Sequence, residues 1–125
     1  MKIKTQDLTG PALDWAVAKC RGFEGIDEDQ WLLRDGIADM PLSAYNPSTD
    51  WSQGGPIIEQ EGVELICNLN PAEAATFKTE PHWRASKRAW AKGDIWYGPT
   101  PLIAAMRCYV ASRLGDAVDI PEELL

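Results

Sequence analysis

The sequence predicts an α+β fold: a small, mostly antiparallel sheet with two principal helices packed against it. Apolar residues recur at spacings of three and four in two segments, 11–20 and 101–114, a pattern typical of amphipathic helices. Between these segments, short apolar runs alternate with turn-forming residues, which is typical of strands. The 125 residues contain no internal repeat and no long linker, so we expect a single domain over residues 1–125.

The first half of the chain is expected to begin with a strand that leads into a packing helix. Pro is tolerated in the first turn of a helix and Gly commonly ends one, and both residues stand at the matching places. The expected elements, in order, are a strand over 2–5, a helix from Gly10-Pro11 to Gly22, a loop over 23–29, a strand over 31–33 that ends at the Asp35-Gly36 turn, and a long ordered loop over 42–56.

The second half ends in the best-defined helix of the chain. Thr100 is a good cap, Pro101 stands at the first helical position, and Gly115 lies just past the end. The expected elements, in order, are a short helix over 56–61, a strand over 63–67, a helix over 72–77, two strands over 82–86 and 94–96 joined by a hairpin through Lys92-Gly93-Asp94, and the final helix over 101–114.

Charge and composition argue against several classes of protein. Twelve basic residues against nineteen acidic ones leave a net charge of −7, which is far from the basic footprint of a nucleic-acid binder. No run approaches the roughly 18 consecutive apolar residues of a membrane span. The N-terminus lacks the apolar core of a signal peptide, so we expect a cytoplasmic protein. The three cysteines lie far apart and suggest neither a disulfide framework nor a zinc cluster.

The charges are unevenly distributed along the chain. The segment 24–39 holds six acidic residues against Arg34, and the segment 78–92 holds five basic residues against Glu80. Such blocks could pair with each other or with another copy in a homo-oligomer, although most charged residues simply face solvent. Trp83 and Trp90 stand among the basic residues, but the overall acidity favours sheet packing over a nucleic-acid platform.

Signatures of catalysis are missing from the sequence. It contains no phosphate-binding loop, no nucleophile elbow and no Cys-x-x-Cys pair, and His82 is the only histidine. We therefore predict no cofactor, no metal site and no catalytic residue. For an enzyme that acts on nucleotides, the best candidates would be Asp50, Glu59 and His82.

The segment 45–56 concentrates polar and aromatic side chains that suit a small ligand. Its aromatic rings could stack, its carboxylate could accept from a hydroxyl or amine, and its glycines expose backbone N–H groups. The alternative is a self-satisfied loop in which a polar side chain caps a helical turn and the glycines turn the chain. The candidate ligand-binding residues here are Tyr45, Asn46, Ser48, Thr49, Asp50, Trp51, Gln53, Gly54 and Gly55.

A second candidate segment leads into the final helix and comprises Tyr97, Gly98 and Thr100, with Arg107 two turns along. A helix N-terminus presents free N–H donors and a partial positive charge, which favour an anion. Pro99 and Pro101 remove two donors, however, and Thr100 caps another, so a rigid helix entry is the alternative.

Three runs of sequence resemble the NinX-like proteins, small accessory proteins encoded by tailed bacteriophages and prophages. The runs are 45–59 (YNPSTDWSQGGPIIE), 97–107 (YGPTPLIAAMR) and 8–18 (LTGPALDWAVA). The resemblance spans nearly the whole chain and is loosest over 67–95. It implies expression inside an infected bacterium, in its cytoplasm, and it carries no catalytic residues because the family has no assigned biochemical function.

Three functions are compatible with these observations. The first is a non-catalytic binder of a small polar, anionic ligand such as a nucleotide, held between the two candidate segments; one version sequesters a nucleotide signal of host defence. The second is a protein–protein adaptor that modulates a host or phage enzyme through exposed tryptophans and the acidic segment 24–39. The third, an enzyme that acts on nucleotides, has the least support.

Overall fold

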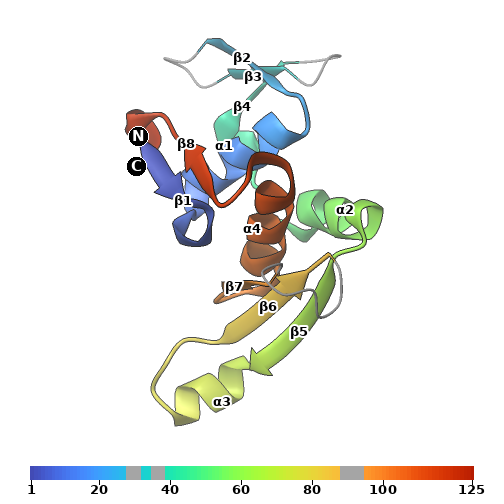
Figure 1. Cartoon of the computed structure of the whole chain (residues 1–125), viewed down its shortest axis with the longest axis vertical. Coiled ribbons are helices and arrows are strands. Elements are labelled where there is room, and N and C mark those ends of the chain that lie inside the picture. The colour runs from blue at the N-terminus through green and yellow to red at the C-terminus, as the bar shows by residue number, and fades with distance from the viewer. Residues whose placement is uncertain (28–31, 35–38, 88–94) are drawn as a thin grey trace.

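Helix α4 (Pro101–Leu114) lies at the centre of the fold, packed against helix α1 (Gly10–Cys20), helix α2 (Trp51–Glu61) and strands β5–β7 (Figure 1). This computed structural model describes residues 1–27, 32–34, 39–87 and 95–125, and of the side chains of 24–39 it describes none. A short helix, α3 (Pro71–Thr76), lies away from the centre. The α+β class is confirmed, with α1 and α4 as the two principal helices.

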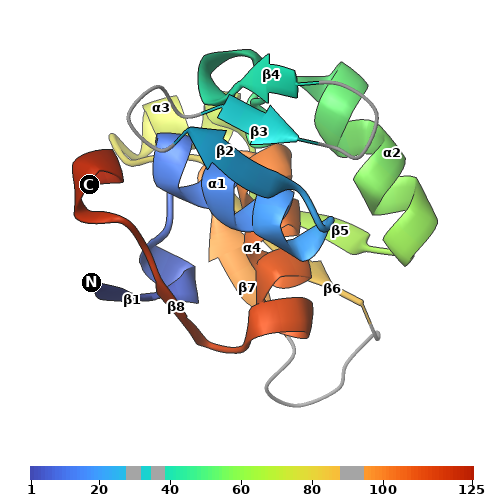
Figure 2. The same ribbon diagram turned by 90° about the horizontal axis from the view of Figure 1, so that it is seen from above.

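The strands form three small antiparallel sheets rather than one. The first pairs β1 (Lys2–Lys4) with β8 (Ala117–Asp119). The second orders β2 (Glu24–Asp27), β3 (Leu32–Arg34) and β4 (Asp39–Pro41), and the third orders β5 (Glu64–Leu69), β6 (His82–Ser86) and β7 (Trp96–Gly98). The three-stranded sheets lie at opposite ends of the long axis, and the two chain ends lie side by side (Figures 1 and 2).

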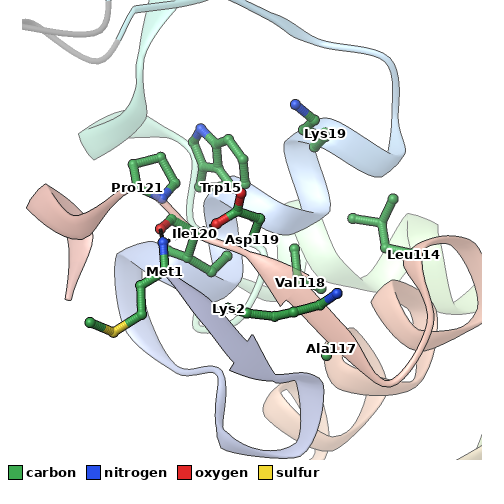
Figure 3. A pocket seen from close by; sticks show the side chains of 10 residues that line it. All are labelled: Met1, Lys2, Trp15, Lys19, Leu114, Ala117, Val118, Asp119, Ile120 and Pro121. Carbon is green, nitrogen blue, oxygen red and sulfur yellow. Dashed lines mark hydrogen bonds and ion pairs between the residues drawn. The ribbon is translucent and has the colours of Figure 1, made fainter.

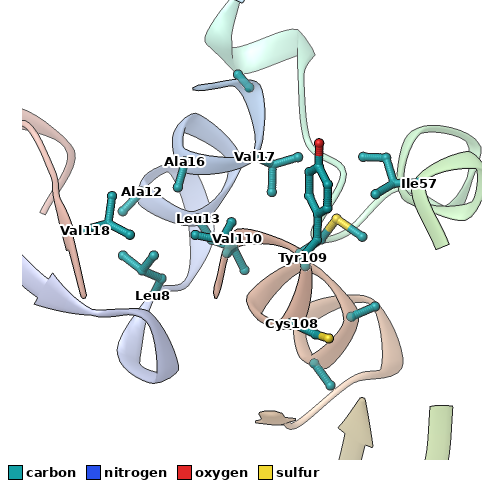
Figure 4. Packing of buried hydrophobic residues seen from close by; sticks show 14 of the residues in the cluster. Leu8, Ala12, Leu13, Ala16, Val17, Ile57, Cys108, Tyr109, Val110 and Val118 are labelled. Carbon is teal, nitrogen blue, oxygen red and sulfur yellow. The ribbon is translucent and has the colours of Figure 1, made fainter. Parts of the chain in front are cut away.

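The hydrophobic core fills the space between α1 and α4 (Figure 4). On α1, Leu13 and Val17 are fully buried, as the apolar stripe predicts, and Met106 and Val110 meet them from α4. Ile57 of α2 closes the cluster on a third side. Burying one such side chain stabilises the fold by roughly 1.5–3 kcal/mol, so these few positions hold the two helices together.

The expected long loop over 42–56 is wrong. Strand β4 precedes it, a 3-10 turn η2 (Leu42–Ala44) follows, and α2 begins at Trp51 instead of Pro56. The carboxylate of Asp50 caps this helix by accepting the N–H of Ser52 at 2.9 Å. Helix α2 therefore runs through Gly54, Gly55 and Pro56, and it ends at Gly62 in the left-handed conformation.

Other boundaries also differ from the expectation. Residues 24–27 form strand β2 rather than a loop, and β8 had no counterpart in the prediction. The hairpin partners are correct, because β6 and β7 pair with Ala85 opposite Trp96. The Asp35-Gly36 turn, the Lys92-Gly93-Asp94 loop, and the residues Trp31, Arg88 and Trp90 lie outside the described residues.

Two further 3-10 turns complete the fold, η1 (Thr5–Asp7) after β1 and η3 (Glu122–Leu124) near the C-terminus. Of the helices in the described ranges, none is both long and apolar enough to cross a membrane.

Candidate functional site

A pocket of about 470 Å³ opens between the start of α1, the segment from η2 to Thr49, and η3. This volume lies in the range of sites for small ligands, roughly 300–1,000 Å³. Three of the predicted site residues line it: Tyr45, Asn46 and Thr49. The full lining, which we call the Asp14 pocket, is Gly10, Pro11, Asp14, Leu42, Ser43, Tyr45, Asn46, Thr49 and Leu124.

The carboxylate of Asp14 is the central polar group of this pocket. Asp14 is only 6% exposed, and its Oδ1 accepts the backbone N–H of Ser48 at 2.9 Å. Burial raises the pKa of this carboxyl, and hydrogen bonding from Ser48 partly opposes the rise. Asp14 is not among the candidate residues that the sequence patterns indicate. A signal was present, since the residue is a lone carboxylate on the apolar stripe of α1, one turn before Val17.

One residue that lines the pocket carries a side-chain oxygen without a hydrogen-bond partner among the described residues. The Oδ1 atom of Asn46 is buried and unbonded in the part of the chain that the structure describes. The backbone of Asn46 is held separately, because its N–H donates to Gln53 Oε1 at 2.6 Å. A buried acceptor without a partner costs roughly 1–3 kcal/mol, which a ligand that donates a hydrogen bond would recover.

Tyr45 and Thr49 complete the polar lining. The Tyr45 ring is buried against Phe23, with ring centroids 5.1 Å apart. Burial raises the pKa of its hydroxyl to about 12, so the group stays protonated at neutral pH. Thr49 is exposed at the pocket. Asp14, Asn46 and Thr49 therefore offer oxygen acceptors beside a protonated phenol.

The other predicted residues of the first segment serve the start of α2. Asp50 caps the helix, and hydrogen bonds from Ser52 lower the pKa of its carboxyl. The side chain of Gln53 donates from Nε2 to the carbonyl of Ala44 at 2.8 Å, which ties the helix to η2. Trp51 is 55% exposed and does not line the Asp14 pocket.

Two glycines in this segment meet different surroundings. A Cβ on Gly54 would lie 2.6 Å from Leu102 Cδ2 and would also collide with the carbonyl oxygen of Pro47. Gly54 therefore lets α2 approach α4 closely. A Cβ on Gly55 would meet nothing closer than the ring of Trp51 at 4.0 Å. Ser48 is buried and contributes its backbone N–H to Asp14.

The second segment forms a rigid entry to α4. Thr100 caps the helix by accepting the N–H of Ile103 at 3.1 Å, and Arg107 donates to the carbonyls of Leu8 and Tyr97 at 2.8 and 2.7 Å. A Cβ on Gly98 would lie 2.7 Å from the backbone nitrogen of Ala104. These groups hold the chain in place, and the N–H of Ile103 and two nitrogens of the Arg107 guanidinium already have partners within the protein.

The two candidate segments meet through packing, since Gly54 lies against Leu102 at the contact of α2 with α4. Among the described residues that line the Asp14 pocket, however, none belongs to 97–107. The ring of Tyr97 instead stacks on His82, with centroids 5.1 Å apart and planes 15° apart.

The enzyme candidates serve separate local structures. Asp50 is bonded to Ser52, His82 stacks on Tyr97, and Glu59 is exposed on α2. No hydrogen bond joins any two of the three within the described ranges. Over the same ranges, no group of three or more His, Cys, Asp or Glu side chains is placed to hold a metal ion.

Comparison with known proteins identifies one family. A family model described as "Bacteriophage P22, NinX" matches residues 4–113, which include both candidate segments and Asp14. No curated protein matches the chain.

Proposed function

Because the chain belongs to the NinX family of bacteriophage proteins, it is a phage accessory protein, and we propose that it binds a small polar ligand in the Asp14 pocket. The observation that carries this proposal is that two residues lining one pocket of ligand size hold a buried carboxylate and a buried, unbonded amide oxygen. Burial keeps both groups from forming hydrogen bonds with water, so a ligand with matching donors would satisfy both.

The lining favours a ligand that donates hydrogen bonds. A carboxylate has two oxygens and accepts two parallel N–H bonds, as it does from arginine. The base of guanosine presents two adjacent N–H donors of this kind. Pro11, Leu42 and Leu124 supply apolar surface against which a flat ring can pack.

The lining of the Asp14 pocket favours a different orientation for a nucleotide from the one expected from the sequence, in which the anion lies between the two candidate segments. No basic side chain is among the described residues that line the Asp14 pocket, and Arg107 is engaged with backbone carbonyls elsewhere. We therefore place the base of a nucleoside or nucleotide at Asp14 and any phosphate toward solvent. Inside an infected bacterium, such binding without turnover would withdraw a nucleotide signal of host defence from its receptor.

The test is a titration of ¹⁵N-labelled protein with guanosine, adenosine, cytidine and uridine, followed by NMR. We expect guanosine to shift the amide signals of Ser48 and Thr49, and Asp14→Asn to weaken this binding at least about tenfold. Glu59→Gln is the matched control, because it removes one exposed carboxylate from outside the pocket. The proposal fails if no nucleoside shifts these signals or if Asp14→Asn binds as well as Glu59→Gln.

An adaptor role is the second candidate, favoured by one exposed aromatic side chain. Phe77 is 69% exposed at the end of α3, which the β5–β6 hairpin carries away from the rest of the molecule (Figure 1). Exposed aromatic residues often anchor protein–protein contacts. Strands β2 and β3 of the acidic segment 24–39 lie at the opposite end of the long axis (Figure 1), so this segment would form a separate contact surface. Capture of a specific host or phage protein that Phe77→Ser abolishes would favour this role over ligand binding.

A further inference from the structure

We propose a second ligand site, for a small organic anion with a flat ring, in a pocket of about 510 Å³ where α1 meets the β1–β8 sheet (Figure 3). This site is independent of the proposed function, because it shares no lining residue with the Asp14 pocket. Its lining, which we call the Trp15 pocket, is Met1, Lys2, Trp15, Lys19, Leu114, Ala117, Val118, Asp119, Ile120 and Pro121.

The charges in the Trp15 pocket are opposite in sign to those of the chain as a whole. The protein carries a net charge of −7, yet Lys2 and Lys19 enter this pocket from β1 and α1, with Asp119 as the one acidic residue among the lining residues that the structure describes (Figure 3). Two lysines gathered at one concave surface of an acidic protein create a local positive potential, which attracts small anions.

The carboxylate of Asp119 already has a partner. Its Oδ1 lies 2.9 Å from the ammonium of Met1, and that contact, followed more weakly by Lys2 and Lys19, lowers the pKa of the carboxyl. By contrast, neither Lys2 nor Lys19 forms an ion pair with a carboxylate within the part of the chain that the structure describes. The two ammonium groups remain available to an anion.

An indole ring supplies the second half of the site. Trp15 is half-buried in the wall of the pocket, and the Nζ atom of Lys19 lies 5.1 Å from the centroid of its ring. This cation–π contact holds the lysine over the ring before any ligand arrives, which lowers the entropy lost on binding. Together with Pro121, the indole offers an apolar surface for a flat ring.

The experiment uses phenyl phosphate as the probe, with inorganic phosphate and phenol as its two halves. The readout is the NMR signal of the Trp15 indole N–H. We expect phenyl phosphate to shift this signal at lower concentration than either half, because only the whole probe engages both the lysines and the ring. Added salt should weaken the binding, since its charge interactions are exposed.

Single substitutions distinguish binding in the Trp15 pocket from a non-specific attraction of the anion to positive charge. We expect Lys19→Gln and Lys2→Gln each to weaken phenyl phosphate binding about tenfold. Lys4→Gln is the control, because it removes the same charge from the same strand but does not line the pocket. Equal weakening by all three variants, or no shift of the Trp15 signal by phenyl phosphate, would overturn the proposal. Failure here leaves guanosine binding at Ser48 unaffected, and Asp14→Asn should leave phenyl phosphate binding unchanged.

Discussion

The Asp14 carboxylate on α1 accepts the backbone N–H of Ser48 at 2.9 Å, and this bond ties α1 to the turn that leads into α2. The two residues are 34 positions apart in the chain. The same carboxylate lines the Asp14 pocket, so one buried acidic group both fixes the wall of the pocket and faces its interior. The fold and the proposed ligand site therefore share this side chain.

Asp14 should make the protein less stable as pH rises. Burial raises the pKa of Asp14 in the folded state above its value in the unfolded state. At pH values between these two pKa values, the folded protein therefore binds more protons than the unfolded protein. Its contribution to stability is complete below about pH 4 and is lost as pH rises through the folded-state pKa. Urea unfolding at a series of pH values should show this decline in the native protein and a weaker one in Asp14→Asn. An identical decline in both proteins would contradict the assignment.

Gly54→Ala should destabilise the protein because the added methyl group has no room. It would lie 2.6 Å from Leu102 and collide with the carbonyl of Pro47. Overpacking of this kind costs about 1–3 kcal/mol in the free energy of unfolding. Gly55→Ala is the matched control, since its Cβ meets only ordinary contact distances and alanine favours a helix by about 1 kcal/mol. Urea unfolding of the two variants measures the difference, and equal stabilities would show that the α2–α4 contact is looser than described.

Arg107 should contribute to stability rather than to ligand binding. It donates to the carbonyls of Leu8 and Tyr97, and burial lowers the pKa of its guanidinium. Hydrogen bonds to a charged group contribute about 1.5–3 kcal/mol, so Arg107→Gln should lower the free energy of unfolding by this order. The Arg107→Gln variant should bind guanosine with the same affinity as the native protein in the NMR titration. If the variant loses guanosine binding but keeps its stability, Arg107 belongs to the ligand site and this prediction is wrong.

Glu61 should stabilise the protein only above acid pH. Its Oε1 pairs with Arg113 and with Lys87, each at 3.0 Å, and hydrogen bonds from these two groups lower its pKa. A lowered folded-state pKa gives stability that is present above the unfolded value and is lost as pH falls through the folded one. Glu61→Gln should therefore cost about 1 kcal/mol near neutral pH and less in acid or high salt. A cost that is independent of pH and salt would rule out the ion pairs as its source.

The two principal helices could be predicted because their signals are local. In α1 and α4, the proline near the start, the glycine just past the end and the apolar stripe all lie within one segment, and the structure confirms each helix. The start of α2 could not be predicted in this way. Gly54, Gly55 and Pro56 have low helix propensity, and contact with Leu102 of α4 compensates for it.

The sequence indicated some of the residues that line the Asp14 pocket, but not all of them. The segment that contains Tyr45, Asn46 and Thr49 was selected for its side-chain chemistry, and these three residues line a pocket. The position of Asp14 on an apolar stripe is a local signal of burial, but its contact with Ser48, 34 positions away, is encoded by no local pattern. Strand β8 was not predicted for the same reason, since its three residues are held by pairing with β1 at the other end of the chain.

Native mass spectrometry of the protein purified from phage-infected bacteria tests the central claim most directly. The native protein and the Glu59→Gln control should both carry a bound small molecule of nucleoside or nucleotide mass, and Asp14→Asn should lack it. Lys19→Gln should retain it, because Lys19 lies outside the Asp14 pocket. If the native protein carries no small molecule, or if Asp14→Asn retains the same one, the Asp14 pocket is not the ligand site.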